Sequence, residues 1–270
     1  MVNIDSVQYT RYASNADLSE LVEHYWSVVS PAPPGPLRAV LVPNGRATIQ
    51  FCLGNPGRRF ATGVPVQSNA DVYLPVETQP VVIEQEGASH YVGIQFTPWG
   101  ARVLFPGAPQ QPTQVTEFLG PLPDKAALAV RPAEELNRWV AGFLPADTGA
   151  EIRGRDLLAA AIRRIDEDPT GVQVQQLHAG LHVSASTLYR VFRCGIGLSP
   201  KQYIQVIRYR AFTDALLEES GGQPAALVAA LSGYADEAHA SREFSRFTGM
   251  TATMFRDTFD GIARLMARRY

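Results

Sequence analysis

The chain has 270 residues, a formal net charge of −2 at pH 7, 19% charged residues and 46% hydrophobic residues. This length exceeds the usual size of one domain and predicts two domains, and the composition excludes an intrinsically disordered chain. No apolar run approaches the roughly 20 residues of a membrane span, and the first residues lack the basic-then-apolar layout of a secretory signal, so we expect a cytoplasmic protein that makes no contact with membranes.

The first half reads as strands and loops. Leu37–Val42 leads into the turn signal Pro43-Asn44-Gly45, and Arg46–Leu53 follows it. The second of these segments places apolar residues at alternate positions: Ala47, Ile49, Phe51 and Leu53. Such alternation is typical of a strand with one buried face. The sequence therefore predicts a β-hairpin across this turn.

Further along, Val81–Gln85 and His90–Phe96 are predicted strands, and then the period changes. Pro98–Phe105 is a predicted short helix, and Ala133–Leu144 is a longer one. The longer helix carries four large apolar residues at helical spacing: Leu136, Trp139, Val140 and Phe143. A surface helix does not usually leave so many exposed. They must be covered, either by the helix's own domain or by a second copy in a symmetric homodimer.

Proline marks the boundary between the domains. Seventeen of the 20 prolines lie in residues 1–150, and proline is excluded from helix interiors. Pro145–Gly149 is the predicted linker, which gives domains at 1–148 and 149–270. The two cysteines, Cys52 and Cys194, fall in different domains, so a disulfide framework is not expected and a reducing cytoplasm fits.

The second half reads as helices. The expected helices are Asp156–Ile165, Val174–Leu181, Ser184–Cys194, a long one from Pro200 to about Ser220, and Asp236–Thr248. Ser199 before Pro200 fits an N-cap followed by the first helical position, and Gly221-Gly222 ends the long helix. Pro224 opens another short helix.

Leu177–Phe192 has the parts of a helix-turn-helix unit: a short helix, a turn of three to four residues, a serine cap at Ser184 and a second helix. In this geometry the first helix braces the second, whose N-terminal turns enter the major groove of DNA. The polar positions of the second helix are Ser186, Tyr189, Arg190 and Arg193. Arg190 could bond two acceptors on one guanine edge.

Ala225–Phe247 repeats this pattern, with a turn at Ser232-Gly233-Tyr234. A linker helix of about 20 residues spans about 30 Å, close to the roughly 34 Å between successive major grooves on one face of DNA. Ser184–Arg210 also holds five cations and no carboxylate, which could present a positive face to phosphates. One chain could therefore read two consecutive grooves.

The stretches VSASTLYRVFRCGIGLSPKQYIQVIRYRAFTDALL and GYADEAHASREFSRFTGMTATMFR closely resemble the AraC/XylS family of bacterial transcription regulators. The resemblance covers roughly Arg155–Thr258. It implies base contacts in the first unit from Ser186, Tyr189 and Arg190, and in the second unit from Glu237, Ala238, Ser241 and Arg242. His182 stands at a turn position that the family usually fills with glycine, and histidine tolerates a left-handed backbone better than most residues.

The first domain resembles the uncharacterised domain that precedes this DNA-binding module in many bacterial regulators. The matching segments are HYWSV, LVPNGRATIQFCLGNP and HYVGIQFTPWGARVLFPGAP. In the wider family such domains bind small effectors or mediate dimerisation. The aromatic residues that could line an effector pocket are Trp26, Tyr91, Phe96 and Trp99, although aromatic residues in a strand-rich domain are more often plain core.

The sequence favours neither a metal site nor a catalytic cysteine. His178 and His182 lie four residues apart, but the turn begins between them and no third metal ligand is evident. Cys52 alternates with the apolar face of its strand, and a catalytic thiol would need a base partner; His24 and His90 are the candidates, without a motif around them. We expect no metal, no cofactor and no catalysed reaction.

The sequence thus predicts an α+β protein of two domains: a strand-rich N-terminal domain with flanking helices, and an all-α C-terminal domain with two helix-turn-helix units joined by a long helix. The expected function is transcription regulation by sequence-specific binding of promoter DNA, with RNA polymerase, a small-molecule effector and a second copy of the chain as further partners. One alternative is a DNA-binding module fused to an enzymatic or DNA-damage-response domain with a methyl-accepting cysteine. Another is a module that binds only proteins.

Overall fold

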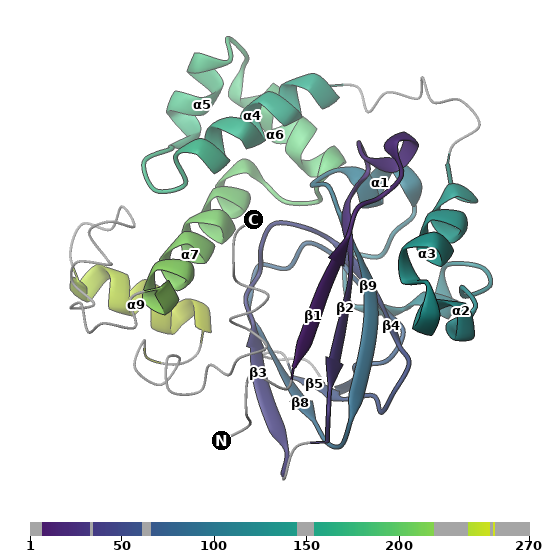
Figure 1. The fold of residues 1–270 in the computed structure, drawn as a ribbon. Coiled ribbons are helices and arrows are strands. Elements are labelled where there is room, and N and C mark those ends of the chain that lie inside the picture. Colours follow the sequence, from purple (N-terminus) through teal and green to yellow (C-terminus); the bar gives the residue numbers. More distant parts are fainter. Residues whose placement is uncertain are drawn as a thin grey trace. The chain divides into compact units, whose positions relative to one another are not determined.

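The structure is a computed structural model that describes residues 7–32, 35–60, 66–144, 154–218, 237–248 and 251. The chain divides into two compact units (Figure 1). An N-terminal unit comprises residues 1–38, 46–77 and 82–152, and a C-terminal unit comprises 39–45, 78–81 and 153–270. Within the described residues the first part of the chain is rich in strands and the second is helical, which confirms the predicted α+β class with a strand-rich first part and a helical second part.

The larger sheet has six strands in the order β1-β2-β9-β4-β7-β10. Their bounds are Gln8–Tyr12 (β1), Val22–Ser30 (β2), Ser89–Phe96 (β9), Thr48–Cys52 (β4), Val72–Leu74 (β7) and Thr113–Gln114 (β10). All the pairs that join these strands are antiparallel. A shift of register between Val22 and His24 marks a β-bulge in β2.

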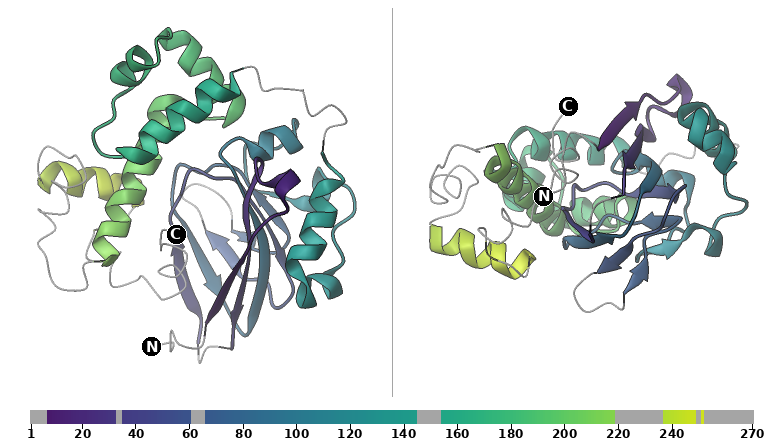
Figure 2. Two further views of the ribbon diagram at one scale, coloured as in Figure 1. Left: turned by 45° about the horizontal axis from the view of Figure 1, so that its top comes forward. Right: turned by 60° about the horizontal axis from the view of Figure 1, so that its bottom comes forward.

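One face of this sheet forms the main hydrophobic core of the N-terminal unit. Ile49 and Phe51 of β4 and Ile94 and Phe96 of β9 are fully buried in it. Because successive side chains of a strand point to opposite faces, this is the face that the alternation in Arg46–Leu53 predicts. Two helices, α2 (Lys125–Val130) and α3 (Pro132–Ala141), lie along the sheet, as both views of Figure 2 show.

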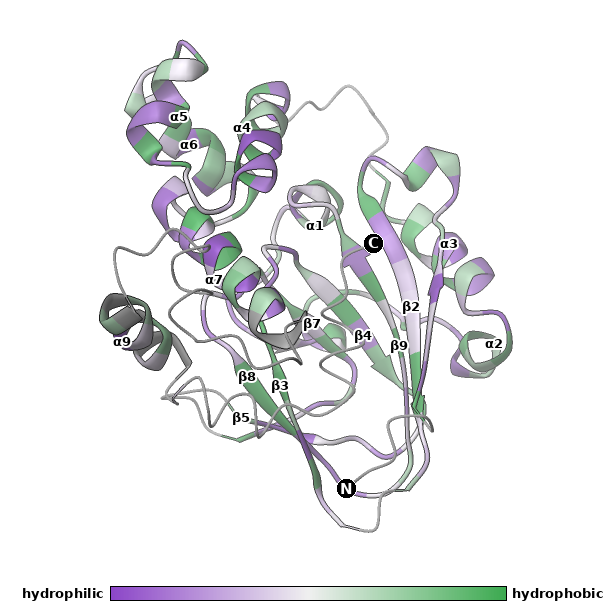
Figure 3. Ribbon diagram, turned by 60° about the vertical axis from the view of Figure 1, so that its left-hand side comes forward, coloured by the Kyte–Doolittle hydropathy of each residue, from purple (hydrophilic) through white to green (hydrophobic). Residues whose placement is uncertain are grey.

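The smaller sheet has four strands in the order β3-β8-β5-β6. Their bounds are Leu37–Leu41 (β3), Val81–Gln85 (β8), Arg58–Phe60 (β5) and Gln67–Ser68 (β6). Apolar residues predominate along β3 and β8 (Figure 3). The remaining short elements described in the N-terminal unit are α1 (Gly100–Leu104) and the 3-10 turns Ala16–Leu18 and Val115–Glu117.

The predicted hairpin across Pro43-Asn44-Gly45 is wrong. Both of its segments are strands, but β3 pairs with β8 in the smaller sheet, whereas β4 lies between β9 and β7 in the larger one. Gly45 has a left-handed backbone, with φ 77°, a conformation that glycine adopts readily in turns. Six residues separate β3 from β4, so the chain changes sheets here instead of folding back on itself.

The apolar side of α3 is covered within its own unit. Leu136 and Val140 are fully buried, and Trp139 and Phe143 pack against the same core. The Trp139 ring stands edge-on to Phe51, with centroids 5.3 Å apart, and its indole N–H donates to the carbonyl oxygen of Pro121 at 2.9 Å. Of the two ways to cover this helix, the structure shows packing within the chain.

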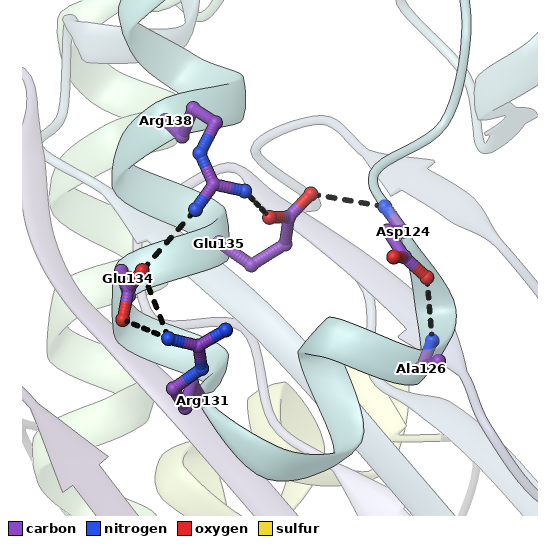
Figure 4. Close-up of polar contacts among 6 residues, drawn as sticks. All are labelled: Asp124, Ala126, Arg131, Glu134, Glu135 and Arg138. Atoms are coloured by element: carbon purple, nitrogen blue, oxygen red, sulfur yellow. Dashed lines mark hydrogen bonds and ion pairs between the residues drawn. The ribbon is translucent and has the colours of Figure 1, made fainter.

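A buried carboxylate joins α3 to α2 (Figure 4). Glu135 accepts a hydrogen bond from the backbone N–H of Asp124 at 3.0 Å and forms an ion pair with Arg138. Asp124 is itself the N-cap of α2, because its side chain accepts from the N–H of Ala126 at 2.9 Å. These polar contacts therefore tie the start of α2 to α3.

The helical unit contains α4 (Arg155–Glu167), α5 (Val174–Gly180), α6 (Ala185–Gly195), α7 (Pro200–Glu218) and α9 (Glu237–Thr248). Leu158, Ala161, Ile162 and Ile165 of α4 are buried along the stripe that its sequence predicts. No helix among the described residues is long and apolar enough to cross a membrane.

Candidate nucleic-acid interface

The helices α5 and α6 form a helix-turn-helix unit. Leu177 of α5 is buried, and the backbone of the turn closes through hydrogen bonds from Val183 to His178 and from His182 to Ala179. His182 has φ 54°, the only positive φ among the described non-glycine residues. The left-handed backbone inferred at this position from the family pattern is therefore present.

Ser184 caps α6. Its hydroxyl oxygen accepts from the backbone N–H of Thr187 at 3.1 Å, which satisfies one of the donors that a helix N-terminus leaves without a partner. The cap fixes where the helix starts, so it also fixes which residues occupy its first two turns.

The two sides of α6 differ sharply. Leu188, Val191 and Phe192 are buried, and the Phe192 ring contacts Tyr203 of α7 at a centroid distance of 5.7 Å. The predicted DNA-binding residues of α6 all lie exposed: Ser186, Tyr189, Arg190 and Arg193. Tyr189 is 51% exposed, a large value for an aromatic side chain. This arrangement leaves the polar face of the helix open to a partner.

Arg193 differs from Arg190 in its contacts. Its Nη1 donates to the carbonyl oxygen of Gly197 at 2.8 Å, and its guanidinium lies 6.0 Å from the centre of the Tyr189 ring. That distance is at the limit of a cation–π contact. Arg193 therefore holds the end of α6 and lies beside Tyr189.

The helix α7 begins with a capping box. Ser199 accepts from the N–H of Gln202 at 3.3 Å, and the Gln202 amide oxygen accepts from the N–H of Ser199 at 3.0 Å. This reciprocal pair satisfies two backbone donors at once. The sequence predicted Ser199 as the cap but not the return bond from Gln202, which the S-x-x-Q spacing signals.

The five cations of Ser184–Arg210 do not form one face. Arg190, Arg193 and Lys201 are exposed. Arg208 is partly buried and donates to the carbonyl oxygen of Val172 at 3.3 Å, and Arg210 pairs with Asp214 at 2.8 Å. The carboxylate lies four residues beyond Arg210, just outside the window whose charge suggested a continuous positive surface.

Of the second predicted unit, the structure describes the second helix, α9. Ala238, Ser241 and Arg242 are exposed on it, whereas Phe244 is buried against Tyr209 and Phe212 of α7, at centroid distances of 5.8 and 5.3 Å. The side chain of Glu237, Gly221-Gly222, the short helix predicted after Pro224, and the turn at Ser232-Gly233-Tyr234 lie outside the described residues.

The predicted effector-pocket residues do not share one face. Phe96 belongs to the helix-covered core and stands edge-on to Phe105 at 5.8 Å. Trp26 pairs in register with Gly93, and Tyr91 with Val28, so Trp26 and Tyr91 lie on the opposite face of the sheet. Trp99 is partly buried beside α1, and its indole N–H donates to the carbonyl oxygen of Glu20 at 3.1 Å.

No hydrogen bond joins Cys52 to His24 or His90 in the described part of the chain. Burial is the main cause that raises the pKa of the Cys52 thiol, and its Sγ donates to the carbonyl oxygen of Gly54 at 3.3 Å. Burial also lowers the pKa of both histidines, to about 4 for His24. No group of three or more potential metal ligands occurs among the described residues.

Comparison with known proteins assigns both parts of the chain. Residues 177–258 match a family model described as a helix-turn-helix domain, and residues 10–116 match a domain of unknown function, DUF6597. Together with the exposed face of α6, these matches show that the chain carries a helix-turn-helix domain of the DNA-binding class. Its helix-turn-helix part is of the AraC type and its N-terminal part is a DUF6597 domain, which confirms both predicted resemblances.

The chain is also similar to individual proteins. It is 29% identical over 119 residues to the regulatory protein ada of Salmonella typhimurium, which is 44% of this chain and 33% of that protein. The chain thus spans about a third of that relative's length.

Among solved structures, ToxT from Vibrio cholerae is 9% identical with a TM-score of 0.48, over 94% of this chain and 99% of that one. The C-terminal domain of AraT, a response regulator from Geobacillus stearothermophilus, is 21% identical with a TM-score of 0.36, over 39% and 88%. The DNA-binding domain of AdpA in complex with a target DNA is 23% identical with a TM-score of 0.34, over 37% and 89%.

Proposed function

We propose that this regulator reads promoter DNA chiefly through α6, with Ser186, Tyr189 and Arg190 contacting base edges in the major groove. The observation that carries this proposal is the polar face of α6, which stays exposed while the opposite face is buried. Arg190 suits a guanine because its planar fork matches two acceptors. In this proposal residues 149–270 form the DNA-binding domain.

The second unit would contribute less. Between Gly233 and Arg256 it has three cations and three anions, so it offers phosphates no net attraction. Glu237, Ala238, Ser241 and Arg242 are its proposed contacts. Of these, only Arg242 carries a positive charge, and Ala238 can touch only apolar atoms.

Arg190→Ala tests the proposal. Because Arg190 would bond a base, its loss should weaken specific binding by roughly 1–3 kcal/mol and relax the preference at one base position. The operator would first be found by selecting random duplexes with the purified full chain, and affinities then measured by fluorescence anisotropy at fixed salt. Arg163→Ala, which removes an exposed arginine of α4, is the matched control. Arg242→Ala should cost less than Arg190→Ala, and the reverse order would contradict the dominance of the first unit.

The N-terminal domain, residues 1–148, is proposed to sense a small-molecule effector. Effector binding would shift the population between states that differ in DNA affinity. RNA polymerase, and a second copy of the chain on a paired site, are the proposed protein partners, and the cytoplasm is the proposed location. In this proposal the domain catalyses no reaction.

The alternative of a methyl-accepting or otherwise reactive cysteine is disfavoured by Cys52. The thiolate is the reactive form, and reactive cysteines have a lowered pKa. Burial raises the pKa of Cys52 instead. Mass spectrometry after incubation with methylated DNA should find this cysteine unmodified, and transfer of a methyl group to it would restore the alternative.

A further inference from the structure

The N-terminal unit contains a buried arginine whose hydrogen bonds are incomplete. Arg59 of β5 is 2% exposed and is among the largest fully buried side chains. Its Nη2 donates to both carboxylate oxygens of Glu77 at 2.6 Å. Its Nε and Nη1 are also buried, and neither has an acceptor within hydrogen-bond distance in the described part of the chain.

The strand register shows which way Arg59 points. Arg58 pairs with Glu84 and forms ion pairs with it and with Glu86, whereas Arg59 pairs with the buried Ile83. Neighbouring residues of a strand project to opposite faces. Arg59 therefore shares its face with Ile83 and, two residues further along β8, with Gln85.

That face is turned toward the larger sheet. The Tyr91 hydroxyl of β9 donates to the Gln85 amide oxygen at 3.0 Å and accepts from the N–H of Gly57 at 2.8 Å. Tyr91 lies on the same face of its sheet as Trp26, opposite the helix-covered core. The Arg59 guanidinium thus belongs to the interior between the two sheets, and not to a surface ion-pair network.

A second incomplete group lies beside it. Asn69 donates its backbone N–H to Gly57 at 2.8 Å, which continues the pairing of β5 with β6. Its side chain is 4% exposed, and its Oδ1 has no hydrogen-bond partner in the described ranges. Asn69 stands diagonally across from Arg59, at a spacing of about 7–8 Å between backbones. Two donor groups of Arg59 and the Oδ1 acceptor of Asn69 therefore lack partners among the described residues, and they lie on the same face of neighbouring strands.

Charge narrows the kind of molecule that would complete these bonds. Buried polar groups of native proteins nearly always have partners, because leaving them unpaired is costly. The Arg59–Glu77 pair is neutral as a whole, so an anion here would gain little from Arg59 and would be repelled by Glu77. An uncharged group that both accepts and donates fits better, and an amide is such a group.

We propose that this interior is a binding site for a small uncharged molecule of the amide type. Its carbonyl oxygen accepts from Arg59 Nη1 or Nε, its N–H donates to Asn69 Oδ1, and the buried Ile83, which pairs with Arg59, offers apolar surface on the same face. This site rests on the proposed effector-sensing role of the domain and gives that role a ligand class.

Benzamide, benzoate and ethylbenzene test the proposal, since they share a ring and differ in the polar group. The full chain, labelled with ¹⁵N, is titrated with each while the Arg59 Nε–H resonance, assigned through its bonds, is followed by NMR. Benzamide should shift this resonance saturably, and the other two should not. Arg59→Lys keeps a charge for Glu77 but removes the planar fork, so benzamide affinity should fall by about tenfold or more. Arg58→Lys, on the other face of the same strand, should leave it unchanged.

Asn69→Ala leaves the Arg59–Glu77 ion pair intact and should also weaken benzamide binding. This second variant keeps the test valid if Arg59→Lys does not fold. An Arg59 resonance that benzamide does not move would overturn the assignment, as would a stronger response to benzoate. Benzamide that binds the wild type, Arg59→Lys and Asn69→Ala equally would also overturn it, while leaving effector sensing by this domain standing. If benzamide binds at Arg59 but leaves the affinity of the full chain for its operator DNA unchanged, the effector role of the domain is refuted instead.

Discussion

Arg190 and Arg193 lie within one turn of each other on α6 and have the same charge, yet their surroundings assign them different roles. Arg190 is exposed and no described residue bonds to its guanidinium. Arg193 is tied to Gly197 and lies beside Tyr189. We propose that Arg193 contacts a phosphate and supports Tyr189, so Arg193→Ala should weaken binding of operator and scrambled DNA by similar factors. Arg190→Ala should mainly lower the ratio between them. Competition binding with both DNAs measures this, and a larger loss of specificity from Arg193→Ala would assign base reading to that residue.

At the same scale, His24 predicts a dependence of stability on pH. It is buried, Arg11 donates to its Nδ1 at 2.8 Å, and burial followed by the charge of Arg11 lowers its pKa from 6.5 to about 4. The folded state therefore prefers the neutral ring. This stabilisation is complete above pH 6.5 and is lost progressively as the pH falls from 6.5 to 4, by about 2–3 kcal/mol. Urea denaturation at pH 7 and pH 4.5 measures it. His24→Gln, which can still accept from Arg11, should lose less stability on acidification than the wild type does, and an equal loss in both would refute this role.

Among the elements, those with local signals were predictable. The stripe of α4, the cap of α6 at Ser184 and the serine–proline start of α7 depend on residues within one or two turns, and all three are confirmed. Strand partners depend on residues far apart in the chain, so the turn signal at Gly45 could not reveal that β3 and β4 join different sheets. Likewise, the sequence predicted an effector pocket from aromatic residues, whereas the site that we propose depends on the incomplete hydrogen bonds of Arg59 and Asn69. Two-residue strands such as β6 bring these groups together and have no periodic signal.

Two serines of one helix end separate stability from binding. Ser184 bonds the backbone of Thr187, while Ser186 bonds only the Ser184 hydroxyl among the described groups. Ser184→Ala should lower the free energy of unfolding by about 1 kcal/mol. Ser186→Ala should lower it by less and should weaken operator binding more than it lowers stability. Chemical denaturation and anisotropy on both variants measure this, and equal stability losses would show that Ser184 is not the cap on which α6 depends.

For the whole molecule, the question is what holds two copies together if the regulator binds a paired site. The sequence left open a homodimer through the apolar side of α3, but that side packs on its own core. Trp139 contacts Phe51 and Phe143 and donates to Pro121. A carboxylate there would replace a ring that packs on the core by a charge beside apolar side chains, which is costly. Trp139→Glu should therefore lower the free energy of unfolding of the N-terminal domain by about 3 kcal/mol or more, which is typical of a disrupted core. Its thermal midpoint should fall accordingly.

The oligomeric state of the molecules that remain folded should not change, because the apolar side of α3 already packs on the core of its own unit. Sedimentation velocity of wild type and Trp139→Glu at tens of micromolar, below the melting range of the variant, measures this. Arg131→Glu, which reverses an exposed charge at the start of the same helix, is the control for a change of charge alone. A wild type that sediments as a dimer beside a folded, monomeric Trp139→Glu would show that the helix is shared between two copies, and the packing of Trp139 on Phe51 would then be only part of its role.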